Sequence, residues 1–227
     1  MYRGLVVTKR GFSLFLLLII SCAFLHGQEI ITAARYLEMV GNHYASLRDY
    51  EANIEIRTGT STMTGNVSHR APNLLRIDFS RPADQVIVFN GEALTVYLPE
   101  FRAVLNQPLA RAGGGSTLGL SMLRRNYTAA YLTGPNPEPL DPGSSVRVIK
   151  LRLTRNTTAE GFREIILSID PNTRLIRRME GRTIADNEVR FDLTNIRTNV
   201  GIPDARFVYD TPSLATMYNN FLFRDND

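Results

Sequence analysis

The fold of this chain is decided by residues 72–98, which read PNLLRIDFSRPADQVIVFNGEALTVYL. In the first part of this stretch, Leu75, Ile77 and Phe79 alternate with charged residues. Side chains on a β-strand point to opposite faces in turn, so this alternation predicts a half-buried strand.

Two more strands follow within the same stretch. Residues 85–89 and 93–98 are rich in β-branched and aromatic side chains, and Asn90-Gly91 separates them. An Asn-Gly pair between apolar runs is a strong hairpin signal. The three strands carry more apolar side chains than one buried face needs, so the surplus must be covered by helices or held for a ligand.

The rest of the chain adds more strands and two helical regions. Apolar residues recur at helical spacing over residues 30–47, and a short apolar helix is expected over 118–125, with a further turn at 129–132. Together these patterns predict a mainly β protein, with about ten or eleven strands in one antiparallel sheet curled around the helices. The other expected strands cover residues 50–57, 63–67, 146–154, 163–170, 173–180, 189–197 and 205–209.

The N-terminus has the pattern of an export signal over residues 1–27. Basic residues precede an apolar run over residues 12–25, which is shorter than the roughly 20 residues of a membrane span. We expect cleavage after Gly27, which leaves residues 28–227 as one domain.

Cys22 gives the same segment a second interpretation. The sequence Ile-Ile-Ser-Cys at residues 19–22 fits a lipobox, in which the thiol is acylated and the protein becomes membrane-anchored. The alternative is that Cys22 is only a small apolar member of the signal. Because Cys22 is the single cysteine of the chain, neither interpretation leaves a disulfide framework.

The charge of the expected mature domain argues against nucleic acid as a partner. Removal of Arg3, Lys9 and Arg10 leaves 23 basic residues of the original 26, against 22 acidic ones. A nucleic-acid-binding protein needs a concentrated basic face, which this nearly balanced composition does not provide.

The sequence shows no catalytic or metal-binding pattern, and we expect no enzyme activity, metal or cofactor. His43 and His69 stand alone, without further ligands at metal spacing. Residues 113–117 read GGGST, which lacks the lysine of a phosphate-binding loop. We interpret these glycines as a hinge before the helix at 118–125.

Residues 72–107 and 201–209 resemble the LolA family of periplasmic lipoprotein carriers. The shared features are the Pro-x-x-apolar-x-apolar strand, the following Pro82, the Asn90-Gly91 hairpin and an aromatic-Pro strand end. The resemblance implies an incomplete barrel closed by helices over an apolar cavity, where lipoprotein acyl chains bind.

The resemblance also implies positions for the site. It assigns Leu118, Leu120, Met122 and Leu123 to a lid over the cavity. The family often has a basic residue directly before the motif proline, where this chain has Ala71, so Arg70 is the candidate for cargo handling. The side chains assigned to the cavity wall are Leu75, Ile77, Phe79, Val88, Val96 and Leu98.

Three functions remain open at this point. The first is a monomeric periplasmic carrier that takes acylated lipoproteins from an inner-membrane transporter to an outer-membrane acceptor. The second is a membrane-anchored lipid-binding lipoprotein of the same fold, with Cys22 acylated. The third is the sensor domain of an envelope-stress pathway.

Overall fold

The structure is a computed structural model that describes residues 31–108, 117–156 and 161–220. The expected export signal, Cys22 and the glycines at 113–115 lie outside these ranges. The strands are β1 (Asp49–Thr58), β2 (Ser61–Arg70), β3 (Leu74–Arg81), β4 (Val86–Phe89), β5 (Ala93–Leu98), β6 (Ala103–Pro108), β7 (Tyr127–Tyr131), β8 (Glu138–Pro139), β9 (Arg147–Arg155), β10 (Phe162–Ile169), β11 (Ile176–Thr183), β12 (Glu188–Thr198) and β13 (Thr216–Asn219).

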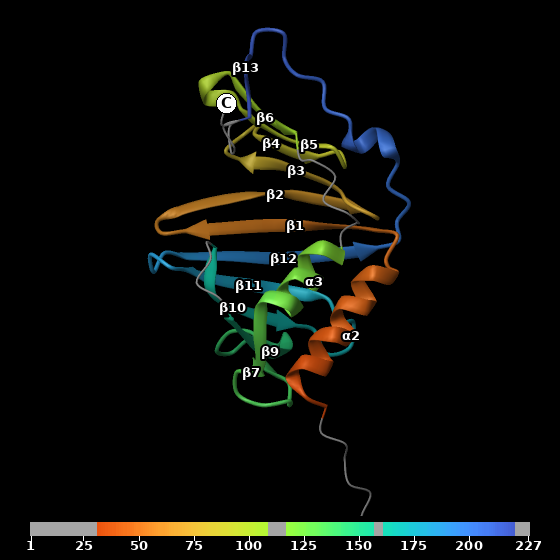
Figure 1. Ribbon diagram of the computed structural model, residues 1–227, viewed down its shortest axis with the longest axis vertical. Coiled ribbons are helices and arrows are strands. Elements are labelled where there is room, and N and C mark those ends of the chain that lie inside the picture. Colours follow the sequence, from red (N-terminus) through yellow and green to blue (C-terminus); the bar gives the residue numbers. More distant parts are fainter. Residues whose placement is uncertain (1–30, 109–116, 157–160, 221–227) are drawn as a thin grey trace, which may run out of the picture. The chain divides into compact units, whose positions relative to one another are not determined.

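These strands form one 13-stranded sheet in the order β13-β6-β5-β4-β3-β2-β1-β12-β11-β10-β9-β7, with β8 paired to β9 (Figure 1). The pairing path ends at β13 and β7, so the curled sheet does not close into a barrel. The predicted fold class is confirmed, although the described residues contain more strands than the ten or eleven expected. The parallel pair of β13 with β6 is a departure from the expected antiparallel order.

The β1–β12 pair joins the two halves of the chain. Strands β1 to β6 follow one another as an antiparallel meander, and β9 to β12 form a second one. Ile54 of β1 lies opposite Leu193 of β12, so residues far apart in the sequence share one apolar face. This face is called the inner face below, and the other is the outer face.

Helix α2 (Ala33–Ser46) confirms the predicted N-terminal helix and covers part of the inner face. It begins where the Thr32 hydroxyl accepts a hydrogen bond from the Arg35 amide, which satisfies one free N–H of the first turn. Leu37 and Val40 are fully buried in a cluster with Leu151 of β9 and Leu167 of β10. The apolar stripe of the helix is therefore packed against the second meander.

Helix α3 (Thr117–Asn126) lies beside α2 on the same face of the sheet (Figure 1). Its Leu120 and Leu123 pack at the border of the cluster formed by α2, β9 and β10. The expected helical turn at residues 129–132 is wrong, because Tyr127–Tyr131 is strand β7, paired with β9. Thus α3 is connected directly to an edge strand of the sheet.

The C-terminal part of the chain covers the outer face of the first meander. The strand expected at residues 205–209 is wrong, because Asp204–Phe207 is the 3-10 helix η3, which contacts β3. Arg76 of β3 donates side-chain hydrogen bonds to the carbonyl oxygens of Arg206 and Val208. A side chain therefore satisfies backbone groups that a sheet partner would satisfy in a strand.

Candidate functional site

An apolar cavity of about 730 Å³ lies on the inner face, between the sheet and α3. This volume is within the range of about 300–1,000 Å³ that is typical of ligand pockets. Its described lining residues are Tyr44, Tyr50, Ile54, Val67, His69, Leu75, Ile77, Leu120, Leu123, Asn126, Tyr127, Arg155, Gly161, Phe162, Ile165, Leu167, Ile176, Met179, Phe191 and Leu193. Most of these side chains are aliphatic or aromatic, which suits an apolar ligand.

The strand register explains why these side chains meet. Val67 of β2 lies opposite Ile77 of β3, and His69 lies opposite Leu75. Residues directly opposite one another in a sheet point to the same face. The wall of the cavity is thus built from every second residue of neighbouring strands in both meanders.

The predicted wall residues fall into three groups. Leu75 and Ile77 line the cavity. Phe79 follows them on the same face, but it is buried in the cluster formed by β1, β2 and β3. The register places Val96 opposite Ile87 and therefore on the inner face, and alternation places Leu98 there too, but neither is among the lining residues.

The assignment of Val88 to the cavity wall is corrected by the register. Val88 lies opposite Arg76 of β3, so it points to the outer face, where it is only 2% exposed. The inner-face residues of β4 are Ile87 and Phe89, which lie opposite Ile77 and Leu75. Because residues 86–89 are apolar on both faces, alternation could not select the correct set.

Two of the four predicted lid residues line the cavity. Leu120 and Leu123 project from α3 over the apolar wall. They are three residues apart, so they lie on one side of the helix. Leu118 and Met122 belong to the same helix, but their side chains lie outside the described part of the structure.

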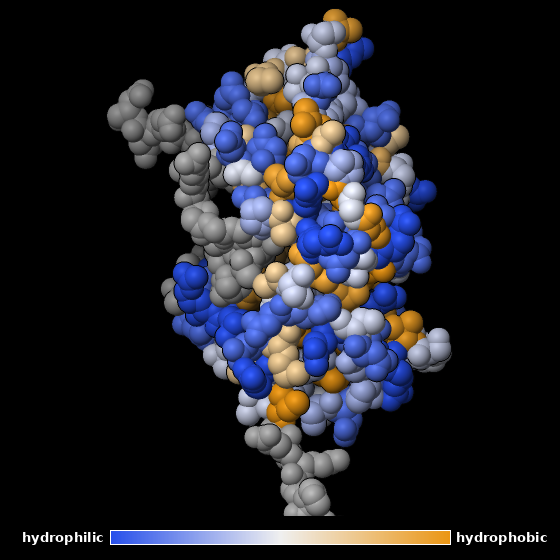
Figure 2. Space-filling view, turned by 90° about the vertical axis from the view of Figure 1, so that its right-hand side faces the viewer, coloured by the Kyte–Doolittle hydropathy of each residue, from blue (hydrophilic) through white to orange (hydrophobic). Residues whose placement is uncertain are grey.

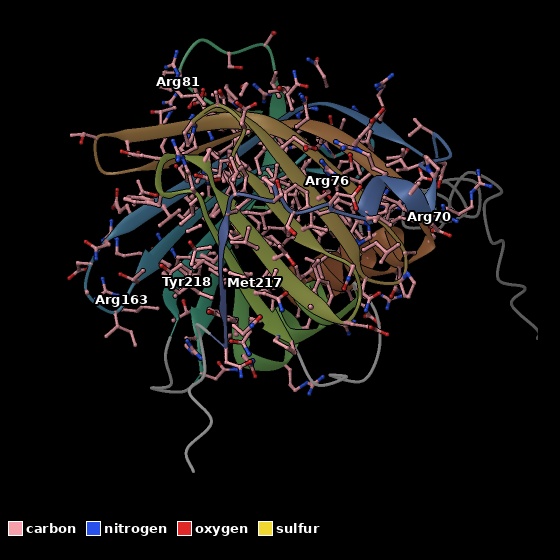
Figure 3. All side chains as sticks on the ribbon, turned by 90° about the horizontal axis from the view of Figure 1, so that it is seen from above. Arg70, Arg76, Arg81, Arg163, Met217 and Tyr218 are labelled. Carbon is pink, nitrogen blue, oxygen red and sulfur yellow. The ribbon has the colours of Figure 1, made fainter. Side chains whose placement is uncertain are left out.

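Arg70 does not face the cavity. Its neighbour His69 points to the inner face, so alternation along β2 directs Arg70 to the outer face. There the guanidinium donates a hydrogen bond to the Ile202 carbonyl oxygen and lies 3.1 Å from the Asp204 carboxylate. Figure 3 shows Arg70 beside the segment that contains η3. In this structure Arg70 fixes the C-terminal segment to the sheet.

A second ionic cluster holds the same segment. Arg76 makes hydrogen bonds to both carboxylate oxygens of Asp78, and Arg206 donates a hydrogen bond to Asp78 as well. Arg76 also lies over the ring of Tyr209, which contacts the ring of Tyr97 on β5. Through these contacts, residues of the same chain cover the outer face of the sheet.

Aromatic and polar side chains form one wall of the cavity. The rings of Tyr50 and His69 are stacked, with centroids 4.9 Å apart, and Tyr44 meets Tyr50 edge to face. The Tyr44 hydroxyl accepts a hydrogen bond of 2.9 Å from the Ile176 amide. Burial raises the pKa of Tyr50 to about 12 and lowers the pKa of His69. All three side chains are therefore uncharged at neutral pH.

Sequence reasoning missed most of the cavity wall. The residues missed include Tyr44, Tyr50, His69, Tyr127 and Phe162. Tyr50 could have been found, because it begins the alternation of residues 50–57. Tyr127 and Phe162 come together only because β7 and β10 both flank β9, which no local pattern indicates.

Metal-binding groups and membrane-spanning helices are both absent from the described residues. No group of three or more His, Cys, Asp or Glu side chains in these ranges is placed to hold a metal ion. No helix within them is long and apolar enough to cross a membrane. The side of the molecule in Figure 2 has small apolar patches between polar residues. Scattered patches of this kind are ordinary on protein surfaces.

Comparison with known proteins gives the family. The model of the family described as outer membrane lipoprotein carrier protein LolA matches residues 55–210, which is more than half of the chain. The chain belongs to the LolA family. The predicted resemblance is thereby confirmed.

Individual relatives are distant. An outer-membrane lipoprotein carrier protein of Haemophilus ducreyi is 26% identical over 83% of this chain and 90% of its own length. An uncharacterized conserved protein of Thermus thermophilus has a TM-score of 0.56 at 13% identity, covering 82% of this chain and 98% of that one. A chain of the MucA/MucB complex of Pseudomonas aeruginosa has a TM-score of 0.51 at 14% identity, covering 78% of this chain and 61% of that one. The two structural likenesses concern the fold alone.

Proposed function

We propose that this LolA-family protein is a periplasmic carrier that holds the acyl chains of lipoproteins in the inner-face cavity. The observation that carries the proposal is the apolar cavity between the sheet and α3, in a chain whose family is described as outer membrane lipoprotein carriers. An acyl chain offers few polar groups, so its affinity comes from burial of about 0.8 kcal/mol per CH₂ group. The cavity supplies that burial without catalytic residues.

The arrangement suggests how such a ligand enters and leaves. The sheet forms a wall whose strands, apart from the edge strand β7, are paired on both sides, whereas α3 covers the cavity through Leu120 and Leu123. A helix of ten residues is marginal on its own, so its stability depends on what it packs against. We propose that α3 moves as the lid and that Leu118 and Met122 take part in it.

The proposed carrier role implies two further partners. Lipoproteins reach a periplasmic carrier from an inner-membrane transporter, and an outer-membrane acceptor removes them. We propose that the chain works as a monomer and that residues 1–27 direct its export.

The alternative of an anchored lipoprotein depends on Cys22, and the mass of the N-terminal peptide of the exported protein distinguishes the two forms. A diacyl or triacyl adduct on Cys22 would identify the anchored form. The third alternative, a sensor domain, would instead require a signalling partner.

The proposal is tested by lipid binding to protein purified after expression of the full chain. A fluorescent fatty-acid analogue should bind saturably, and a diacylated lipopeptide should displace it. The double variant Leu120→Asp/Leu123→Asp should bind at least tenfold more weakly, whereas Arg125→Asp, on an exposed position of the same helix, should bind normally. A folded protein that shows no saturable binding would refute the proposal.

A further inference from the structure

His69 is an unusual member of an apolar cavity wall. Its side chain is only 9% exposed, and neither Nδ1 nor Nε2 has a hydrogen-bond partner in the described part of the chain. Buried polar atoms in native proteins normally have hydrogen-bond partners, so two ring nitrogens without partners call for a functional explanation. Among the described lining residues, histidine is also the only type with an ordinary pKa between 5 and 8.

The neighbours of His69 do not offer a partner for a second ring proton. On β1, Tyr50 covers one side of the ring, and Tyr44 of α2 packs against Tyr50. On β3, the residue opposite His69 is Leu75. A charged imidazolium has two N–H donors, and neither the Tyr50 ring nor the Leu75 side chain accepts a hydrogen bond from these nitrogens. Among the described lining residues of the cavity, Arg155 is the one that carries a permanent charge.

The charged groups nearest in sequence are used elsewhere. The Asp49 carboxylate favours the protonated imidazole electrostatically, but it accepts hydrogen bonds from the Val200 and Gly201 amides. Arg70 and Arg76, which flank His69 and Leu75 in the sequence, point to the outer face and bind the C-terminal segment. The ring is therefore held neutral by its surroundings.

We propose that His69 couples ligand release to protonation, so that the cavity retains an apolar chain only while the imidazole is neutral. This inference rests on the proposed lipid-binding function and adds a regulatory step to it. An acyl chain displaces water from the cavity, and the imidazolium loses more solvation than the neutral ring does. Binding then expels a proton, and by linkage a fall in pH weakens binding.

The experiment measures affinity against pH with an uncharged probe. Protein purified after expression of the full chain is titrated with a fluorescent diacylglycerol analogue, which does not ionise between pH 5 and 8. We expect Kd to rise at least threefold from pH 7.5 to pH 5.5. The upper limit is about tenfold per pH unit, since one proton is linked to each ligand.

Two variants of His69 and one control locate the effect. His69→Phe keeps a ring against Tyr50, and His69→Gln keeps polar atoms, but neither side chain titrates in this range. Both should lose the pH dependence, which is read as the ratio of Kd at pH 5.5 to Kd at pH 7.5 within each variant, because a change of a lining residue also shifts Kd itself. His43→Gln changes the histidine of α2, which is not a lining residue, and should retain the pH dependence of the natural protein.

The outcomes separate this inference from the function on which it rests. Binding at pH 7.5 with the same Kd at pH 5.5 would overturn the role of His69 and leave the carrier proposal standing. A pH dependence of Kd that persists in His69→Phe would also overturn the role of His69. Absence of binding at both pH values would overturn both proposals. An NMR titration of the His69 ring should show a lower pKa with probe bound than without, and an equal pKa would contradict the coupling.

Discussion

Strand β4 is apolar on both faces, and the two faces of the β3–β4 pair are covered in different ways. On the outer face, Val86 and Val88 are buried, and the segment containing η3 lies over β3. On the inner face, Leu75 and Ile77 are only half-buried and line a cavity. The comparison teaches that an apolar face can be closed by the chain itself or kept for a ligand.

The largest effect should come from a charge on the closed face. Val88→Asp places a carboxylate where the native side chain is 2% exposed. An unpaired charge at such a position destabilises by several kcal/mol, and we expect a loss of about 4 kcal/mol or an unfolded protein. Urea denaturation followed by circular dichroism measures it. A loss below about 1 kcal/mol would show that the outer face is open.

A charge on the inner face should spare the fold and remove the ligand. Leu75→Glu leaves the carboxylate beside the cavity, where water can reach it when the lid opens. We expect a stability loss of about 1 kcal/mol, as for a substitution outside a packed core, together with loss of lipid binding. Leu75→Met serves as the control and should bind normally. If Leu75→Glu unfolds the domain as Val88→Asp does, the inner face is ordinary core.

Amide exchange should distinguish the lid from the wall. In the empty protein, exchange across α3 should be fast, because a short helix that packs only at the border of a core cluster opens readily. Lipid should slow exchange in α3 at least tenfold, with little change in the central strands β1 and β12. Equal exchange in α3 with and without lipid would remove the lid assignment.

The smallest expected effect is a pH dependence of stability that arises from His69. Burial lowers its pKa in the folded protein, so the unfolded chain binds the proton more readily. The contribution of the neutral ring is therefore present above pH 7 and is lost as pH falls below the unfolded pKa of about 6.5. We expect His69→Phe to reduce the loss of stability between pH 7.5 and pH 5.5. Urea titrations at pH 7.5 and 5.5 measure the difference.

The sequence by itself predicted the strands and helices in which apolar residues recur at regular spacing. Alternation at residues 75–79 and helical spacing in α2 each reflect one face packed against the rest of the protein. These local patterns also predicted the fold class, and they survive in the folded chain because each one buries its own apolar face. The apolar cavity and the lid were implied by the family resemblance alone, and two of the four lid residues line the cavity.

The tertiary structure decided the features that have no such pattern. Val88 belongs to a run that is apolar on both faces, so only the register of β4 with β3 placed it on the outer face. Residues 127–131 became β7 through pairing with β9, and residues 204–207 became η3 through contact with β3. His69 stood alone in the sequence, and only the fold brought Tyr50 and Leu75 beside it. In each case the deciding contact joins residues from different elements of the fold, which no local window of sequence contains.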